Sequence, residues 1–241
     1  MLTTPQRSIK LMFLAGNLHS GKDTFAALLE ASIGSHAVVK IGMSDPIINL
    51  ASYLYRVKGE GVWSDQYERT IPREELEGRT TRDVLRDVGD ALRSQDPYVW
   101  IQCVVRSILQ VAKSNPSVSL ILVPGTRLIR EAAVAKLMGA RLVGIRRKQA
   151  PTNDLDTPTE REVGYLLDHL CHSVVNNDGS KYDLEQASLR ELSYCPVLTL
   201  HDLQSLTEFT PSLPALVSMV DTHTERYAAS FPTSVQRNSL V

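Results

Sequence analysis

The sequence is poor in cysteine, in long apolar runs and in net charge, and each shortage excludes a class of protein. Its three cysteines are far apart and odd in number, which favours buried thiols in a reducing compartment over a disulfide framework or a zinc set. No uninterrupted apolar run reaches the length that spans a membrane. A formal net charge of −1 provides no global field that would attract nucleic acid or a membrane surface.

The remaining composition is that of a protein with a sizeable core. With 43% hydrophobic and 22% charged residues, the chain of 241 residues fits one large domain or two small ones. The first ten residues lack the apolar centre of a signal peptide. We therefore expect a cytoplasmic protein that has neither nucleic acid nor a membrane as its partner.

Short apolar runs alternate with segments of helical periodicity along the chain. The runs typical of buried strands are 9–14, 37–41, 119–123, 141–145 and 173–175. The segments that predict helices are 23–33, 46–56, 82–93, 97–113, 128–138, 159–170 and 184–192. This alternation predicts an α/β fold with a parallel sheet flanked by helices on both faces. In such sheets the ligand binds at the carboxyl ends of the strands.

The most informative motif is GNLHSGKDT at residues 16–24, directly after the first predicted strand. Its glycines let the backbone curl so that several N–H groups point at one anion, and the following helix N-terminus and Lys22 add positive charge. The spacing indicates a phosphate-binding loop, with a nucleotide polyphosphate as the ligand, rather than a glycine turn that binds nothing. The residues that we expect at this ligand are Gly16, His19, Ser20, Gly21, Lys22, Asp23 and Thr24.

The loop departs from the general pattern at its metal position. Asp23 stands where Ser or Thr normally reaches Mg²⁺, and Thr24 follows it. Because a carboxylate also binds Mg²⁺ directly or through water, both residues are expected to face the metal. P-loop proteins commonly end a later strand with a further aspartate, but the run before Arg127 is Gly125-Thr126. Asp45 is the next candidate carboxylate, although it could instead cap the helix that begins at Pro46.

A second group of candidate residues lies on the predicted helix 82–93. On a helical wheel Arg82, Arg86, Gly89 and Arg93 fall on one side and the apolar residues on the other. Guanidinium groups suit phosphate oxygens, and a glycine among them would let a ligand approach the backbone. The alternative is a solvated face on which neighbouring aspartates neutralise the arginines.

Several segments, taken together and in order, also resemble one family. They are SGKDT at 20–24, MSDPI at 43–47, TRDVL at 81–85 continuing to RSQDPYVW at 93–100, Arg127 with 130–132, DTPTE at 156–160 and VNNDGS at 175–180. In this order they are similar to the bacteriophage deoxynucleoside monophosphate kinases. The most specific element is Lys22-Asp23-Thr24, because the family has that variant of the loop. The resemblance runs from about residue 9 to residue 192.

The resemblance implies a P-loop kinase domain over residues 1–195, with a monophosphate-binding arm at 46–100 and a lid at 147–160. An extension of unknown role follows at 196–241. It implies transfer of the γ-phosphoryl group of ATP, with Mg²⁺, to a (deoxy)nucleoside monophosphate, in the host cytoplasm if a phage encodes the chain. The catalytic residues would be Lys22, Arg93, Arg127 and Asp45. Arg82, Arg86, Gly89, Arg93 and Trp100 would bind the acceptor, and Arg147 and Asn177 would join the ATP-binding set.

Two other functions remain open at this point. One is a P-loop protein that binds nucleotide but turns over poorly, which the missing strand-end aspartate and the long tail favour. The other is a kinase of a different small phosphorylated metabolite. The residues 196–241 fit either a packing appendage or an oligomer contact, so a homodimer is also open.

Overall fold

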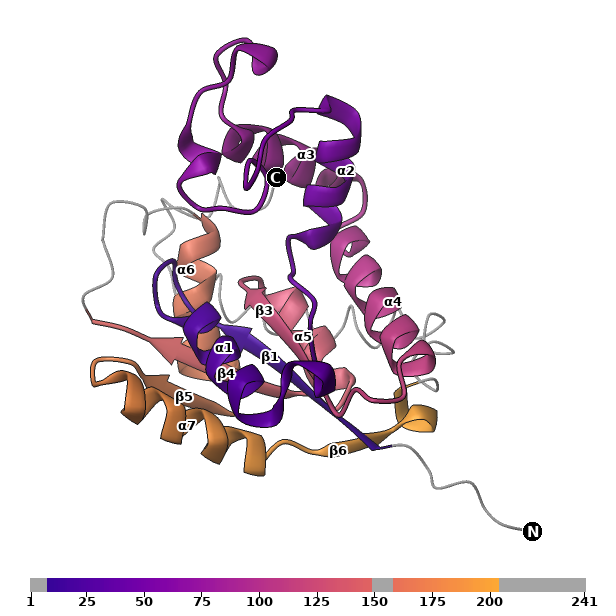
Figure 1. Ribbon diagram of the computed structural model, residues 1–241, viewed down its shortest axis with the longest axis vertical. Coiled ribbons are helices and arrows are strands. Elements are labelled where there is room, and N and C mark those ends of the chain that lie inside the picture. The colour runs from indigo at the N-terminus through magenta and orange to yellow at the C-terminus, as the bar shows by residue number, and fades with distance from the viewer. Residues whose placement is uncertain (1–7, 149–157, 204–241) are drawn as a thin grey trace, which may run out of the picture. The chain divides into compact units, whose positions relative to one another are not determined.

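The computed structural model describes residues 8–148 and 158–203 and divides the chain into two compact units (Figure 1). Residues 42–106 form one of them, here called the helical unit, and the other described residues form the sheet unit. Each unit has its own hydrophobic core. Most of the predicted lid at 147–160 and of the predicted extension at 196–241 lies outside the described residues. Within the described part of the chain, no helix has both the length and the apolar character needed to cross a membrane.

The sheet unit contains five parallel strands in the order β2-β3-β1-β4-β5, which confirms the predicted α/β fold. The strands β1 to β5 are Ser8–Ala15, Val38–Lys40, Leu120–Thr126, Arg141–Arg146 and Ser173–Asn176. All five coincide with apolar runs identified in the sequence. Strands that are covered on both faces need apolar residues throughout, and this makes them visible in a sequence.

Helices cover both faces of this sheet. The helices of the unit are α1 Lys22–Ile33, α5 Ile129–Leu137, α6 Pro158–Tyr165 and α7 Lys181–Ser193, and α4 Val99–Ser114 begins in the helical unit. α1 and α7 lie side by side on one face (Figure 1). Phe25 and Leu29 of α1 and Leu184 of α7 share one buried cluster with Met12 and Leu14 of β1. This packing fixes the start of α1 at the end of β1.

The opposite face is covered by α5 and by a π-helical turn, η5 Leu166–Leu170, which directly follows α6. The sequence predicts one regular helix over 159–170, and the structure differs here because the amide of Cys171 donates to the carbonyl of Leu166, five residues back (2.9 Å). The wider turn buries three leucines against the sheet. One of them, Leu167, lies over Gly144 of β4, where a side chain would meet it.

The three cysteines are free thiols, as the sequence predicts. Cys195 is buried, whereas Cys103 and Cys171 are partly exposed. Burial raises the pKa of the Cys195 thiol, and it raises the pKa of Cys171 to about 12. Both thiols are therefore protonated at neutral pH and are poor nucleophiles.

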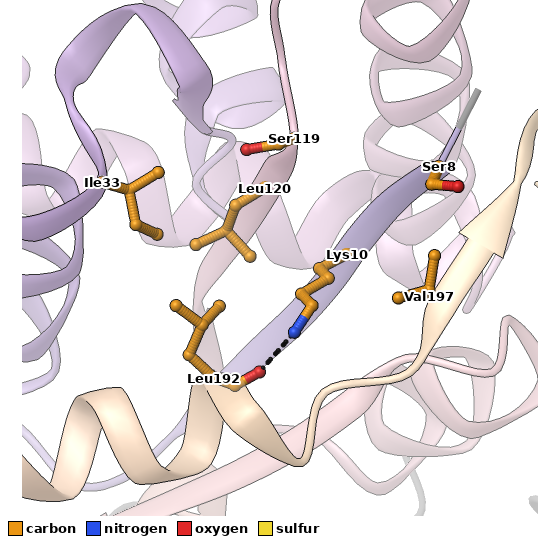
Figure 2. Close-up of a pocket in the computed structure, with 7 residues that line it drawn as sticks. All are labelled: Ser8, Lys10, Ile33, Ser119, Leu120, Leu192 and Val197. Atoms are coloured by element: carbon orange, nitrogen blue, oxygen red, sulfur yellow. Dashed lines mark hydrogen bonds between the residues drawn. The ribbon is translucent and has the colours of Figure 1, made fainter. Parts of the chain in front are cut away.

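A sixth strand, β6 Val197–Thr199, does not follow from the sequence pattern. It pairs antiparallel with the first three residues of β1, along the edge that β4 leaves unpaired because β4 joins β1 only from Met12 onward. Beside it, the Nζ atom of Lys10 donates to the carbonyl of Leu192 (2.8 Å) in a small, mainly apolar pocket (Figure 2). This pocket lies at the beginning of β1, whereas the glycine loop follows its end.

The helical unit contains α2 Asp45–Tyr55, α3 Thr81–Gln95 and the start of α4, with the short turns η2 Glu68–Thr70 and η3 Glu74–Leu76. Its core consists of Ala51, Val57, Val62, Leu76 and Val84. A capping box starts α3: the amide of Asp83 donates to the hydroxyl of Thr80, and the carboxylate of Asp83 accepts from the Thr80 amide. Hydrogen bonds from Thr80 lower the pKa of Asp83.

Candidate phosphate-binding site

The glycine loop, residues 16–21, connects the central strand β1 to α1. β1 ends at Ala15, with β3 and β4 on either side of it, and α1 begins at Lys22. The loop therefore stands at the carboxyl edge of the middle of the sheet, where ligands of such folds bind. This is the position that the sequence predicts for it.

Two glycines of the loop are required by the lack of space around them. A Cβ atom at Gly16 would lie 2.4 Å from the carbonyl oxygen of Ile145 and 2.6 Å from the hydroxyl of Ser20. A Cβ atom at Gly21 would lie 2.2 Å from the side-chain nitrogen of Asn177, and Gly21 has a φ angle of 100°, which side chains disfavour. The loop can keep its curled shape only with glycine at both positions.

The Lys22 ammonium closes the loop from inside. Its Nζ atom donates to the carbonyls of Gly16 (2.8 Å) and Asn17 (2.7 Å) and lies 3.4 Å from the hydroxyl of Ser20. Lys22 is only 7% exposed, and a buried charge of this kind persists because its donors are satisfied. The result is a positive charge held at a fixed place beneath the loop backbone.

The first turn of α1 adds further donors. The first amides of any α-helix have no partner within the helix, and here the N-cap is Gly21, which has no side chain to cap them. Asp23 and Thr24 are exposed on this turn, as is His19 at the tip of the loop, whose φ of 60° is left-handed. Amides, a helix N-terminus and an ammonium together fit a polyphosphate.

A magnesium ion shared with a nucleotide would lie beside the first turn of α1. Among the described residues, no group of three or more His, Cys, Asp or Glu side chains is arranged to hold a metal ion. Mg²⁺ often binds through one or two carboxylates together with phosphate oxygens and water, so a complete protein cage is not needed. Asp23 and Thr24 are therefore the residues that would hold it.

The end of β3 reaches the same edge of the sheet and contains two features that sequence reasoning missed. Thr126 pairs in register with Ala15, is fully buried, and has no hydrogen-bond partner for its hydroxyl within the described part of the chain. The buried carboxylate of Glu131 accepts from the amides of Arg127 (2.8 Å) and Leu128 (3.1 Å), and so it caps the start of α5. Glu131 thereby fixes the backbone at Arg127, which is itself half-buried.

The predicted arginines of α3 lie in the helical unit and contact polar side chains there. Arg86 forms an ion pair with Asp83 (2.6 Å), Arg93 forms one with Asp90, and Arg82 lies 3.4 Å from the side-chain oxygen of Gln66. These contacts match the alternative of a face neutralised by its own aspartates. A role of the arginines toward a phosphate stays a prediction.

Gly89 and Trp100 are buried inside the helical unit. Gly89 is itself buried, and a Cβ atom there would make an ordinary contact, at 3.4 Å, with the side chain of Ile47 in α2. The indole N–H of Trp100 donates to the carbonyl of Gly89 (2.9 Å), and Trp100 is 6% exposed. The backbone of Gly89 is thus covered within the helical unit, and a role of Gly89 toward a ligand stays a prediction.

The remaining predicted residues occupy loop positions and helix ends. The prediction that Asp45 caps the helix is wrong: Asp45 is the first residue of α2, and Ser44 occupies the N-cap position. The Asp45 carboxylate instead accepts from the amide of Gly42 (2.6 Å), which lies before the helix. Arg147 is exposed just after β4. Asn177 follows β5, and its side-chain amide donates to the carbonyl of Ser20 (2.9 Å), so it contacts the loop itself.

The chain has an α/β fold like that of P-loop kinases: a parallel sheet in the order 2-3-1-4-5, with a glycine loop around a buried lysine between the central strand and the first helix. No protein-family model and no curated protein matches the sequence.

The solved structures that are similar to this chain are distant. They include a dephospho-CoA kinase from Campylobacter jejuni (12% identity, TM-score 0.42, covering 77% of this chain and 96% of that one). A shikimate kinase from Aquifex aeolicus has 13% identity and a TM-score of 0.42, and the match covers 76% of this chain and 96% of that one. A shikimate kinase from Acinetobacter baumannii, in complex with shikimate, has 15% identity and a TM-score of 0.39, and the match covers 77% of this chain and 94% of that one. At this distance the fold assignment depends on the strand order and the loop of this chain.

Proposed function

We propose that this chain is an ATP-dependent phosphotransferase that phosphorylates a (deoxy)nucleoside monophosphate. The observation that carries the proposal is the loop of residues 16–21 closed around the Lys22 ammonium at the carboxyl edge of the sheet. Such a site binds a polyphosphate tail. The acceptor class is inferred from the sequence resemblance, whose segments run through both units.

When bound, ATP supplies the transferred group: the bond between its γ-phosphorus and the β,γ-bridging oxygen breaks, and an oxygen of the acceptor's phosphate forms the new bond. The protein's part is positioning and charge neutralisation. The backbone amides of residues 19–22 hold the β- and γ-phosphates. Lys22 contacts the oxygens of Gly16, Asn17 and Ser20 in the loop, and a phosphate oxygen would take the place of one of them.

The metal and the transition-state charge are assigned to four further residues. Asp23 and Thr24 would hold Mg²⁺ directly or through water. Arg127 follows the end of β3, where Glu131 fixes its backbone, and its guanidinium neutralises developing negative charge. Asp45 contributes a further carboxylate once it releases the Gly42 amide.

The acceptor phosphate is assigned to Arg82, Arg86 and Arg93 of α3. The ion pairs of Arg86 and Arg93 are partly or largely exposed, and exposed pairs contribute little to stability, so a phosphate dianion can displace their aspartates. Arg82 would exchange its contact with the side chain of Gln66. Arg147 is assigned to the nucleotide donor, and residues 147–160 to a lid.

We expect Arg93→Ala to weaken binding of the acceptor monophosphate more than binding of the donor ATP. Loss of one charge-assisted hydrogen bond to phosphate raises the KM for the monophosphate about 10- to 100-fold, whereas the KM for ATP changes little. Steady-state kinetics with each substrate varied in turn measures both. Arg106→Ala, an exposed arginine in the same unit, serves as the matched control. Equal changes in both KM values would argue against an acceptor role for Arg93.

A second candidate is a P-loop protein that binds nucleotide but turns over poorly. The specific observation in its favour is the end of β3, where Gly125 and Thr126 offer no carboxylate for Mg²⁺. A coupled ADP-release assay with ATP·Mg²⁺ and a panel of deoxynucleoside monophosphates separates the two. The kinase proposal expects ADP release that depends on one or more of the monophosphates. ATP binding without such release would favour the second candidate, and competition by another phosphate ester would indicate a different acceptor.

A further inference from the structure

The turn that follows β5, residues 177–178, contacts both the loop and the end of β4. The side-chain amide of Asn177 donates to the carbonyl of Ser20 (2.9 Å), and its backbone amide donates to the carbonyl of Arg146 (2.7 Å). The carboxylate of Asp178 accepts from the backbone amide of Lys148 (2.8 Å). Asn177 is therefore held through its backbone while its side chain reaches the loop.

This contact controls one particular peptide group. The carbonyl of Ser20 and the amide of Gly21 belong to the same planar trans peptide, so they point in opposite directions. Fixing the carbonyl on Asn177 fixes the direction of the Gly21 N–H. Glycine places almost no steric limit on rotation of that peptide, so its orientation must be imposed from outside.

The fit around this peptide is close. A Cβ atom at Gly21 would lie 2.2 Å from the Nδ2 atom of Asn177, so the side chain lies directly against the loop backbone. The Gly21 amide is one of the loop donors assigned above to the donor phosphates. Its direction is useful only if it is set before the ligand arrives, because reorientation would cost binding energy.

We propose that Asn177 is a positioning residue that presents the Gly21 amide to the polyphosphate, and not a residue that contacts the nucleotide base. The inference rests on the proposed function, because it takes the loop as the donor site. It replaces the expectation that Asn177 binds the donor nucleotide directly. The two roles predict different dependence on the ligand: a positioning role affects every polyphosphate equally, whereas a base contact affects only adenine nucleotides.

The experiment compares Asn177→Ala, Asn177→Asp and Asn177→Gln with the wild-type protein by calorimetric titration. The probes are ATP·Mg²⁺, GTP·Mg²⁺ and inorganic tripolyphosphate with Mg²⁺. Asn177→Asp cannot donate to the Ser20 carbonyl and repels it, and we expect at least about a 10-fold loss of affinity, equal for all three probes. Asn177→Gln keeps an amide donor and should retain more affinity than Asn177→Asp. Asn176→Ala, at the exposed neighbouring residue, is the matched control and should bind normally.

Circular dichroism and thermal unfolding identify any variant whose fold has changed. Only the folded variants are used to test whether Asn177 positions the Gly21 amide. Unchanged tripolyphosphate affinity in the folded Asn177 variants would overturn the proposal, as would a loss confined to ATP. These experiments measure binding and not turnover. An absence of phosphoryl transfer in every assay would therefore contradict the proposed function, but it would not change the comparison of polyphosphate affinities between the Asn177 variants and the wild-type protein.

Discussion

Replacing Lys22 by methionine removes phosphoryl transfer while the protein stays folded. The variant keeps most of the apolar stem but loses the ammonium that donates to the Gly16 and Asn17 carbonyls. Because this charge is buried beneath the loop and stabilises negative charge on the donor phosphates, we expect kcat/KM to fall by about 1000-fold. Coupled ADP release with the preferred monophosphate measures the loss.

Lys113→Met is the matched control for this variant. Lys113 is exposed in the last turn of α4, so the same substitution there removes a charge without touching the loop. The control should retain wild-type kinetics, and circular dichroism should show that both variants are folded. Activity of Lys22→Met within about tenfold of the wild-type protein would exclude the loop as the donor site.

Gly16→Ala is expected to damage both the loop and the stability of the protein. The new methyl group would lie 2.4 Å from the carbonyl oxygen of Ile145, which belongs to the backbone of β4 and cannot rotate away as a side chain could. The loop must therefore shift outward, and ATP affinity should fall by at least about 10-fold. The free energy of unfolding should decrease by about 1–3 kcal/mol, the usual effect of overpacking. Calorimetric titration and urea unfolding measure the two effects.

Gly78→Ala separates steric overlap from backbone strain. Gly78 also has a positive φ angle, of 81°, but nothing lies within 4 Å of the position that its Cβ would take. Its substitution should cost about 1 kcal/mol and leave ATP binding unchanged. If Gly16→Ala and Gly78→Ala changed ATP affinity and the free energy of unfolding equally, the close contact between Gly16 and Ile145 would not be needed for ATP binding.

The sheet could be predicted from sequence because its signal is local. The three inner strands β1, β3 and β4 are largely buried, and all five parallel strands coincide with apolar runs between helical segments. β6 gave no such signal: Val197–Thr199 is short, half-exposed, and defined by the free edge at the start of β1. The π-helical turn at Leu166–Leu170 is equally absent from the sequence pattern, and its Leu167 packs over Gly144, which lies on a strand distant in sequence.

The same distinction holds for the candidate site. The spacing of Gly16, Gly21 and Lys22 is local, and it correctly placed the loop between β1 and α1. The contact of Asn177 with Ser20 joins residues 157 positions apart and follows only from the strand order. The covered position of Gly89 depends on the packing of α2 on α3, which a helical wheel for α3 alone does not contain.

Titration of ATP·Mg²⁺ into the wild-type protein and into Lys22→Met, followed by calorimetry, tests the central claim most directly. If the loop is a polyphosphate site, the wild-type protein binds ATP·Mg²⁺ saturably at one site, inorganic tripolyphosphate competes, and Lys22→Met loses most of the affinity. A folded wild-type protein that takes up neither ATP nor GTP with Mg²⁺, or a Lys22→Met variant that binds them as tightly, would contradict the account.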